Sequence, residues 1–152
     1  MSLKIVANNR KAFHEYTISD RYEAGLVLTG TEVKSARLGK VNLSDGWVDI
    51  DQNGEAFLRD INIAKYSHGT YANHEETRPR KLLLSKKEIA KLVASSQIKG
   101  YTLVPLKMYF KDQYLKVEIG VAKGKQAHDK RDATREREAN RDIARALRSR
   151  QK

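Results

Sequence analysis

Apolar and polar residues alternate along several short stretches of the chain, in the way that is typical of half-buried β-strands. Two of these stretches flank Asn53-Gly54, a dipeptide that favours a tight hairpin because both residues tolerate positive φ. The last two are rich in β-branched and aromatic residues. The predicted strands are 14–18, 22–28, 47–51, 56–61, 82–84, 101–110 and 114–121.

Two short helices are predicted by capping boxes, in which a hydroxyl residue precedes a glutamate by three positions. Thr29 and Glu32 begin the first helix, and Ser85 and Glu88 begin the second, which Gly100 is expected to end. Antiparallel strands with few short helices favour a closed or partly closed sheet, because closure protects edge strands. The pattern therefore predicts a mainly β fold with short helices, an OB-fold-type antiparallel β-barrel.

The apolar pattern ends near residue 122, which predicts a domain at 1–122 and a basic C-terminal tail at 123–152. Ile143 and Leu147 are the only large aliphatic residues of the tail. Their burial is too little to offset an ordering cost of roughly 1–2 kcal/mol per residue. We therefore expect a tail that is disordered when free and becomes helical when phosphates neutralise its arginines.

Charge points to a polyanionic partner. The net charge is +11 and the sequence pI is about 9.8. Residues 121–152 hold 11 Lys/Arg and 5 Asp/Glu, a net charge of +6, and the preceding 120 residues hold 19 and 14, a net charge of +5. A basic tail on a mildly basic domain is typical of a nucleic-acid-binding arm, and the alternative is a solubilising tail.

The composition also excludes several classes of protein. The chain has no cysteine, which excludes disulfides and thiol catalysis and fits a reducing compartment. No apolar run approaches the ~18 residues of a membrane span, and the apolar patch near the N-terminus is too short for a signal peptide. We therefore expect a cytoplasmic protein that does not enter a membrane.

The sequence predicts neither an active site nor a cofactor or metal site. Asp49, Asp51 and Asp60 could serve a metal-dependent nuclease if they converged, but a wet sheet face is the expected arrangement. The segment Gly120–Lys125 is one residue short of a phosphate-binding loop, and Gln126 replaces the hydroxyl residue that would hold magnesium. We therefore expect a binding protein rather than an enzyme.

A long polar stretch at 62–80 lacks periodicity, and loops of this length are often functional. Its aromatic and imidazole groups suit stacking on unpaired bases, and the guanidinium groups at its end suit phosphates. The alternative is a disordered surface loop. Asn8–Lys11, near the N-terminus, is expected to be an exposed lead-in. The residues that carry this prediction are Tyr66, His68, Tyr71, His74, Arg78 and Arg80 in the stretch and Lys81 directly after it.

Several blocks, taken in order, resemble the small protein B (SmpB) family, which binds transfer-messenger RNA, also called SsrA RNA. The likeness runs nearly end to end. Its blocks are NRKAFHEY at 9–16, YEAGLVLTGTEVKSAR at 22–37, GEAFL at 54–58, RPRKLLL at 78–84, GYTLVPLKMYF at 100–110, KVEIGVAKGK at 116–125 and HDKR at 128–131.

The resemblance implies a role in ribosome rescue by trans-translation. The domain would hold the tRNA-like domain of transfer-messenger RNA and substitute for the missing anticodon arm and codon. The tail would reach the decoding centre of the small subunit and turn helical in the empty mRNA channel. Elongation factor Tu would be a partner through the shared RNA, and the protein would be a monomer. A generic single-stranded nucleic-acid-binding OB-fold protein is the alternative function.

The resemblance also implies the residues of two RNA-facing surfaces. In the tail, His128 would stack on a base of the decoding centre, and Gln126 departs from a lysine that is common in the family. The residues expected to bind RNA are Asn9, Glu23, Lys34, Arg78, Arg80, Lys81 and Leu83. The residues expected to contact the ribosome are Lys123, Lys125, His128, Asp129, Lys130, Arg131 and Ile143.

Overall fold

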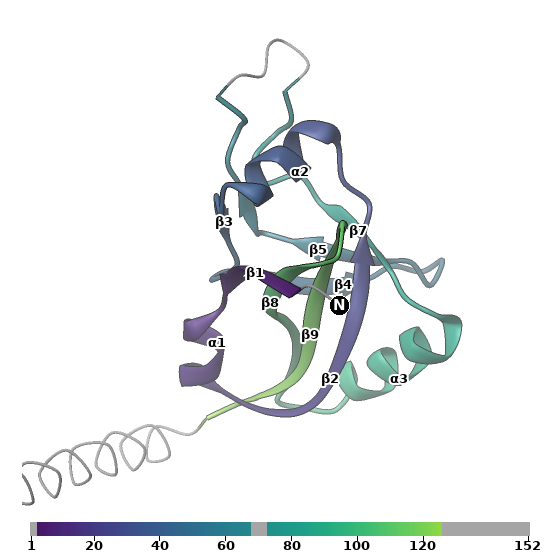
Figure 1. Cartoon of the computed structure of the whole chain (residues 1–152). Coiled ribbons are helices and arrows are strands. Elements are labelled where there is room, and N and C mark those ends of the chain that lie inside the picture. The colour runs from purple at the N-terminus through teal and green to yellow at the C-terminus, as the bar shows by residue number, and fades with distance from the viewer. Residues whose placement is uncertain (1–2, 68–72, 126–152) are drawn as a thin grey trace, which may run out of the picture.

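The main element of the structure, a computed structural model that describes residues 3–67 and 73–125, is a seven-stranded antiparallel sheet (Figure 1). Its strand order is β1-β8-β9-β2-β7-β5-β4, and β3 pairs with β6 beside it. The strands are β1 (Leu3–Asn8), β2 (Tyr16–Leu26), β3 (Val41–Asn42), β4 (Trp47–Ile50), β5 (Ala56–Arg59), β6 (Asn62–Ile63), β7 (Arg80–Leu83), β8 (Tyr101–Lys111) and β9 (Tyr114–Gly124).

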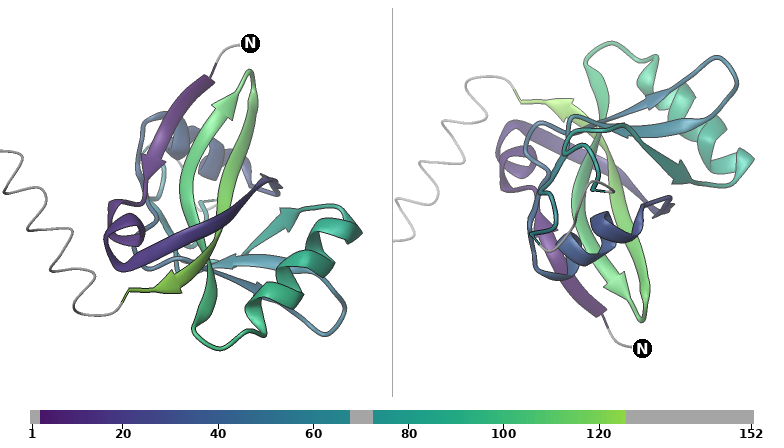
Figure 2. Two further views of the ribbon diagram at one scale, coloured as in Figure 1. Left: turned by 90° about the horizontal axis from the view of Figure 1, so that it is seen from below. Right: turned by 90° about the horizontal axis from the view of Figure 1, so that it is seen from above.

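The described residues contain three short helices, α1 (Arg10–Glu15), α2 (Gly30–Arg37) and α3 (Lys86–Ser96). Both predicted capping boxes are confirmed, because Thr29 and Ser85 each exchange backbone and side-chain hydrogen bonds with the glutamate three positions on. Figure 2 shows α1 and α3 on opposite sides of the sheet. The second predicted helix is α3, which ends before Gly100. The φ of Gly100, +88°, belongs to the turn into β8.

The predicted elements near the N-terminus are wrong in two respects. Leu3–Asn8 is a strand paired with β8, about a hundred positions away in the chain, and Asn9 caps α1. His14 therefore lies in α1, and the predicted strands 14–18 and 22–28 are parts of one strand, β2. A helix of six residues gives almost no periodicity, so the sequence pattern could not identify it.

The predicted hairpin at Asn53-Gly54 is confirmed, although its turn is wider than a two-residue turn. Ile50 pairs with Ala56, and only Gly54 has positive φ, at +74°. The carboxylate of Asp51 accepts backbone N–H bonds from Asn53 at 2.9 Å and Glu55 at 3.0 Å. These side-chain bonds stabilise a wider turn, in which only one residue has positive φ.

The sheet buries a main core on its inner face and a smaller core on part of its outer face. The inner core takes alternate residues of β9, among them Val117, Ile119 and Val121. On the outer face, α1 covers one end of β8 and β9 and buries Ala12 with Leu106. The other end of that outer face carries no helix of the described chain and is free for another role.

The mainly β fold with short helices is confirmed. Among the described residues, however, no hydrogen-bonded ladder joins β1 to β4, so the sheet is not closed as a continuous barrel. The same part of the chain contains no helix long and apolar enough to span a lipid bilayer.

The predicted boundary at residue 122 falls inside β9, which continues to Gly124. Beyond it, the backbone N–H of Lys125 bonds to the carbonyl of Glu15 at 2.9 Å. Lys123 and Lys125, assigned to the tail from sequence, are therefore part of the folded body. The rest of the predicted tail, 126–152, lies outside the described residues.

Candidate nucleic-acid interface

A β-bulge decides which side chains reach the bare part of the outer face. In β8 the register shifts between Pro105 and Lys107, so that Leu106 is the extra residue and lies over Gly120. A Cβ atom on Gly120 would lie 2.8 Å from Leu106 Cδ1, so a larger residue would force the Leu106 side chain to shift. After the bulge, the odd-numbered residues of β8 face outward with the even-numbered residues of β9.

These side chains form a surface that we call the platform, which spans β8, β9, β2 and β7 (Figure 1). It contains five cationic side chains and two carboxylates, a net charge of +3. The platform is defined as Arg21, Glu23, Lys81, Leu83, Lys107, Tyr109, Lys111, Lys116 and Glu118.

Glu23 is held at the centre of the platform by neighbours on β8. Its Oε2 accepts a hydrogen bond of 2.6 Å from the hydroxyl of Tyr109, and its Oε1 lies 3.6 Å from Lys111 Nζ. The hydrogen bond from Tyr109, with help from the charge of Lys111, lowers the pKa of the Glu23 carboxyl against the effect of burial. Burial and the Glu23 carboxylate raise the pKa of Tyr109, so the tyrosine keeps its proton.

Glu118 acts as a second anchor on β9. Its carboxylate lies 3.2 Å from Arg21 Nη1 and 3.7 Å from Lys107 Nζ. The Lys107 ammonium also lies 5.7 Å from the ring centroid of Tyr109. The carboxylates therefore space the cations along the strands rather than cancel them, since the cations outnumber the acids.

Gly25 opens the edge of the platform toward β7. It pairs with Leu83, and an added Cβ atom would lie 3.4 Å from Leu83 and 3.7 Å from Lys116 Nζ. Leu83 is 54 % exposed, a large apolar side chain beside a row of lysines. Lys81 lies on the same face of β7, with Glu55 at 3.8 Å.

The platform suits a nucleic-acid backbone better than unpaired bases. Its lysines and arginine present charged donors to phosphates, and Leu83 offers apolar contact to a sugar or a base edge. Tyr109 is 5 % exposed, so its ring is not open to stacking. The geometry therefore favours a folded RNA that lays its backbone on the sheet.

The two arginines expected to bind phosphate, Arg78 and Arg80, are both hydrogen-bonded to Glu32. The Glu32 carboxylate receives hydrogen bonds from Arg78 and from Arg80, the latter at 2.6 Å. Arg80 is 0 % exposed and also donates to the carbonyls of Ile61 and Glu76. In this conformation the Arg80 guanidinium cannot reach a phosphate. Its bond to Glu32 connects β7 to α2.

The Glu32 cluster remains charged although it is buried. Burial of the Glu32 carboxyl favours its neutral form, but hydrogen bonds from the Thr29 N–H, Arg78 and Arg80 outweigh this effect and lower its pKa. Burial lowers the pKa of Arg80, while Glu32 opposes that change. Each partner therefore keeps the other ionised.

The stretch at 62–80 is packed in part against α2. His74 is buried, with Thr31 Oγ1 at 2.9 Å from its Nδ1 and the Ile63 carbonyl at 2.8 Å from its Nε2. It is therefore no base-stacking residue in this conformation. Lys34 is exposed on α2 beside this loop, and its Nζ lies 5.5 Å from the ring centroid of Tyr66. His68 and Tyr71 lie outside the described residues.

Asn9 is a structural residue rather than part of an exposed lead-in. It is 2 % exposed, and its side-chain amide donates to the carbonyls of Leu43 at 3.2 Å and Pro105 at 2.8 Å. Its side-chain oxygen accepts from the Ala12 N–H at 3.1 Å, which caps α1. Every polar atom of the side chain is thus engaged within the body.

Two of the residues expected to contact the ribosome are described. Lys125 Nζ lies 3.3 Å from the carbonyl of Phe13, and Lys123 Nζ lies 5.9 Å from the ring centroid of Tyr101. Both therefore mark where the chain leaves the sheet near α1. The others lie outside the described residues; they are His128, Asp129, Lys130, Arg131 and Ile143.

The carboxylates considered for a nuclease do not share a site. Asp49 lies 2.8 Å from Arg59, and Asp60 accepts a 2.7 Å bond from the Trp47 indole N–H. Asp51 serves the hairpin turn. Within the described part of the chain, no group of three or more acidic, histidine or cysteine residues is placed to hold a metal ion.

Sequence reasoning missed most of the platform, although a signal was present. Lys107, Tyr109 and Lys111 recur at every second position, as do Lys116 and Glu118, which predicts one shared face. Of the residues expected to bind RNA, the structure places Glu23, Lys81 and Leu83 on the platform. Lys34, Arg78 and Arg80 belong to the α2 region, and Asn9 caps α1.

Comparison with known proteins gives a consistent result over almost the whole chain. The family model described as "SmpB protein" matches residues 6–149. The chain is 51 % identical over 150 residues to an SsrA-binding protein of Geotalea uraniireducens, with 99 % of each chain covered. It is 54 % identical to an SsrA-binding protein of Carboxydothermus hydrogenoformans, covering 97 % of this chain and 98 % of the relative.

A solved structure shares the fold as well as the sequence. It is described as "tmRNA-SmpB: a journey to the center of the bacterial ribosome", and one of its chains superposes with a TM-score of 0.70 at 46 % sequence identity. The match covers 85 % of this chain and 94 % of that chain.

Proposed function

The chain belongs to the SmpB protein family, and from this premise we propose that it binds transfer-messenger RNA and acts in trans-translation, the rescue of stalled ribosomes. The observation that carries the proposal is the platform, a sheet face with a net charge of +3 that suits a folded RNA backbone. No catalytic step is part of the proposal.

We assign the tRNA-like domain of transfer-messenger RNA to the platform. Lys107, Lys111 and Lys116 would contact phosphates, and Leu83 would contact the RNA at the β7 edge. Glu23 would hold Lys111 and Tyr109 in position. Arg78, Arg80 and Asn9 would act indirectly, because their side chains fasten α2, β7 and α1 to the sheet.

The second surface of the proposal is the C-terminal segment. Residues 126–152 would enter the decoding centre and the empty mRNA channel, and the body would take the place of the missing anticodon arm and codon. Elongation factor Tu would bind the same RNA without touching this chain. We further propose that the protein is a cytoplasmic monomer. Support comes from the excess of cations after residue 120 and from the place where Lys125 leaves the sheet near α1.

The test is whether the two surfaces fail separately. Leu83→Asp puts a negative charge among the platform lysines and should weaken binding to the tRNA-like RNA by about tenfold or more. A chain that ends at Ala127 should keep this affinity and lose peptide tagging on stalled ribosomes. Both are measured with purified protein, by RNA titration and by an in vitro tagging assay.

Two outcomes would contradict the proposal. If the shortened chain lost its RNA affinity as well, the surfaces would not be separate. If the intact protein bound unstructured oligonucleotides as tightly as the tRNA-like RNA, it would be a generic single-stranded nucleic-acid binder. Salt dependence alone cannot decide between these functions, because both lose affinity as counterions compete.

A further inference from the structure

The two strands that flank β9 each contain one extra residue. In β8 it is Leu106, which lies opposite residues 118–119 of β9, and in β2 it is Ser19, which lies opposite residues 121–122. Side chains along a strand alternate between the two faces of the sheet, so one extra residue exchanges the faces of all those that follow it. Both strands therefore exchange their faces close to the same level of β9.

The two bulges mark a border on the outer face of the sheet. On one side of them the outward side chains are apolar and pack under α1, as Val104, Leu106 and Ile18 do with Ala12. On the other side the outward side chains are those of the platform. The bulges thus separate the part of the face that α1 covers from the part that is bare.

The pair at the centre of the platform depends on both bulges. A regular β8 would turn Lys107, Tyr109 and Lys111 to the inner face, and a regular β2 would do the same to Glu23. The bond of 2.6 Å from the Tyr109 hydroxyl to Glu23 crosses β9, which lies between the two strands. One bulge without the other would leave these two side chains on opposite faces.

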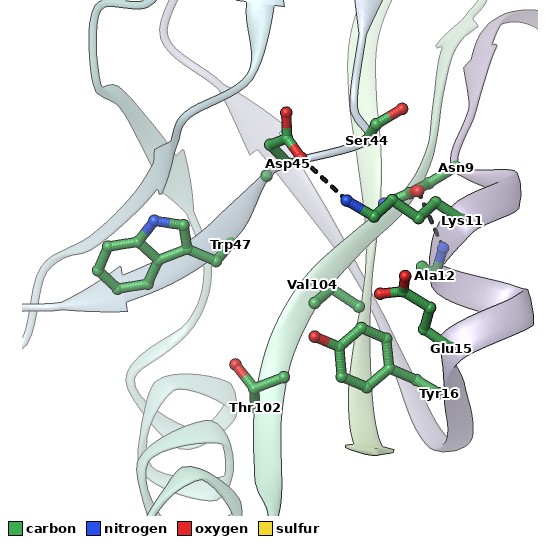
Figure 3. A pocket seen from close by; sticks show the side chains of 11 residues that line it. Asn9, Lys11, Ala12, Glu15, Tyr16, Ser44, Asp45, Trp47, Thr102 and Val104 are labelled. Carbon is green, nitrogen blue, oxygen red and sulfur yellow. Dashed lines mark hydrogen bonds and ion pairs between the residues drawn. The ribbon is translucent and has the colours of Figure 1, made fainter. Parts of the chain in front are cut away.

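The β8 bulge is held by the start of α1. The carbonyl of Leu106 accepts a bond of 2.8 Å from the Asn9 backbone N–H, and the carbonyl of Pro105 accepts one of 2.8 Å from the Asn9 side-chain amide. Figure 3 shows Asn9 at the start of α1, with a dashed line for its bond to the Ala12 N–H. Proline has no N–H to leave unpaired, which suits a residue beside a bulge.

The bulge also fits into a gap in β9. Leu106 is 0 % exposed and lies over Gly120, which is buried as well. A Cβ atom at position 120 would lie 2.8 Å from Leu106 Cδ1 and 3.0 Å from its Cγ, so the Leu106 side chain occupies the space that a larger residue would fill. Neither residue can touch an RNA that lies on the platform.

We propose that Leu106 and Gly120 are positioning residues for RNA binding: they seat the β8 bulge beneath α1, and the bulge brings Tyr109 and the platform lysines to the face that carries Glu23. This role rests on the proposed function, because RNA binding is one of its two readouts. The other readout is the register in the free protein. If the unmodified chain did not bind the RNA, the proposed function would fail while the register could still be tested.

Gly120→Ala tests the role, because its Cβ atom would push Leu106 out of its seat without changing any charge. The hydrogen bond from Tyr109 is the main cause of the low pKa of Glu23, so this pKa should rise. The affinity for the tRNA-like RNA should fall by about three- to tenfold. Carboxyl NMR titration of the free protein and RNA titration measure the two effects, at a temperature where the variant is folded.

Two further variants make the result specific. Ile63→Val removes one carbon from the main core in β6, which pairs with β3 beside the main sheet, and should leave both the pKa of Glu23 and the RNA affinity unchanged. If Gly120→Ala does not fold, Leu106→Val takes its place. The smaller side chain loosens the seat, so it should shift both quantities in the same direction by less.

Three results would overturn the proposal. The first is an unchanged pKa of Glu23 and an unchanged RNA affinity in the folded variant. The second is a loss of affinity with no change in this pKa, because the loss would then not pass through the Tyr109–Glu23 pair. The third is an equal loss in Ile63→Val, which would assign the effect to stability alone.

Discussion

Glu32 shows how one residue can serve two structures at once. One of its oxygens completes the cap of α2 through the Thr29 N–H, and the two oxygens together bind Arg78 and Arg80. Breaking a buried ion pair costs about 3–5 kcal/mol, because the remaining charge is left without a partner. The cluster is therefore a point at which substitution should strongly destabilise the body.

We predict that Glu32→Gln lowers the free energy of unfolding by about 3 kcal/mol, since glutamine keeps the cap but leaves Arg80 uncompensated. The pKa of Glu32 is lower in the folded state than in the unfolded state. Its stabilising effect is therefore complete above a pH of about 4.3 and is lost as the pH falls through the folded pKa. Urea unfolding from pH 3 to 7 should show a shallower acid-side loss in the variant.

The exposed Glu55→Gln is the control for Glu32→Gln, with an expected change within about 0.5 kcal/mol. An equal loss of stability in both variants would mean that Glu32 is no more important than a surface acid.

Tyr109 and Glu23 form the corresponding pair on the platform. Tyr109→Phe removes the hydrogen bond that most lowers the pKa of Glu23, so this pKa should rise. The carboxylate should also lose its fixed position, which we expect to weaken RNA binding by about two- to tenfold. Carboxyl NMR titration and RNA titration measure the two effects. An unchanged pKa would show that the bond contributes little in solution.

At the scale of elements, the sequence predicted those features whose signal is local. The capping boxes at Thr29 and Ser85 and the hairpin around Gly54 are defined by residues a few positions apart. It missed β1 and α1, because their partners in β8 lie about a hundred positions away and the Asn9 side chain binds carbonyls in distant segments. The alternation of Lys107, Tyr109 and Lys111 lies after the bulge at Leu106, but only the strand register shows that these residues share a face with β9.

Glycine positions test the packing of these elements. Gly46→Ala would place a Cβ atom 2.5 Å from Ile61 Cγ2 and 2.7 Å from Pro105, so we expect a loss of about 1–3 kcal/mol in unfolding free energy. Gly30, the first residue of α2, has open space around it, and Gly30→Ala should stabilise by up to about 1 kcal/mol. Thermal or urea unfolding compares the two variants. The same sign of change in both would contradict this account of the packing.

At the scale of the whole molecule, a bulged sheet divides its outer face between two roles. One end is covered by α1, and the other end is bare and carries the platform. The family resemblance indicated Glu23 and Leu83 as RNA-binding residues. The neighbouring lysines could be assigned to the same face only from the strand register of the structure. Periodicity could not reveal that Arg80 is buried, because its role depends on contacts made by folding.

The most direct test of this account measures how the affinity for the tRNA-like RNA depends on salt for two triple variants. One variant replaces Lys107, Lys111 and Lys116 on the platform by alanine. The other replaces three exposed lysines of α3, which make no ion pair with described residues, as a charge-matched control; they are Lys86, Lys87 and Lys91.

The platform variant should bind more weakly, and the slope of log K against log salt should become shallower by about 2–3. The α3 variant should keep a slope close to that of the unmodified protein. Equal slopes for the two variants, or a loss confined to α3, would contradict the claim that the bare outer face of the sheet holds the RNA.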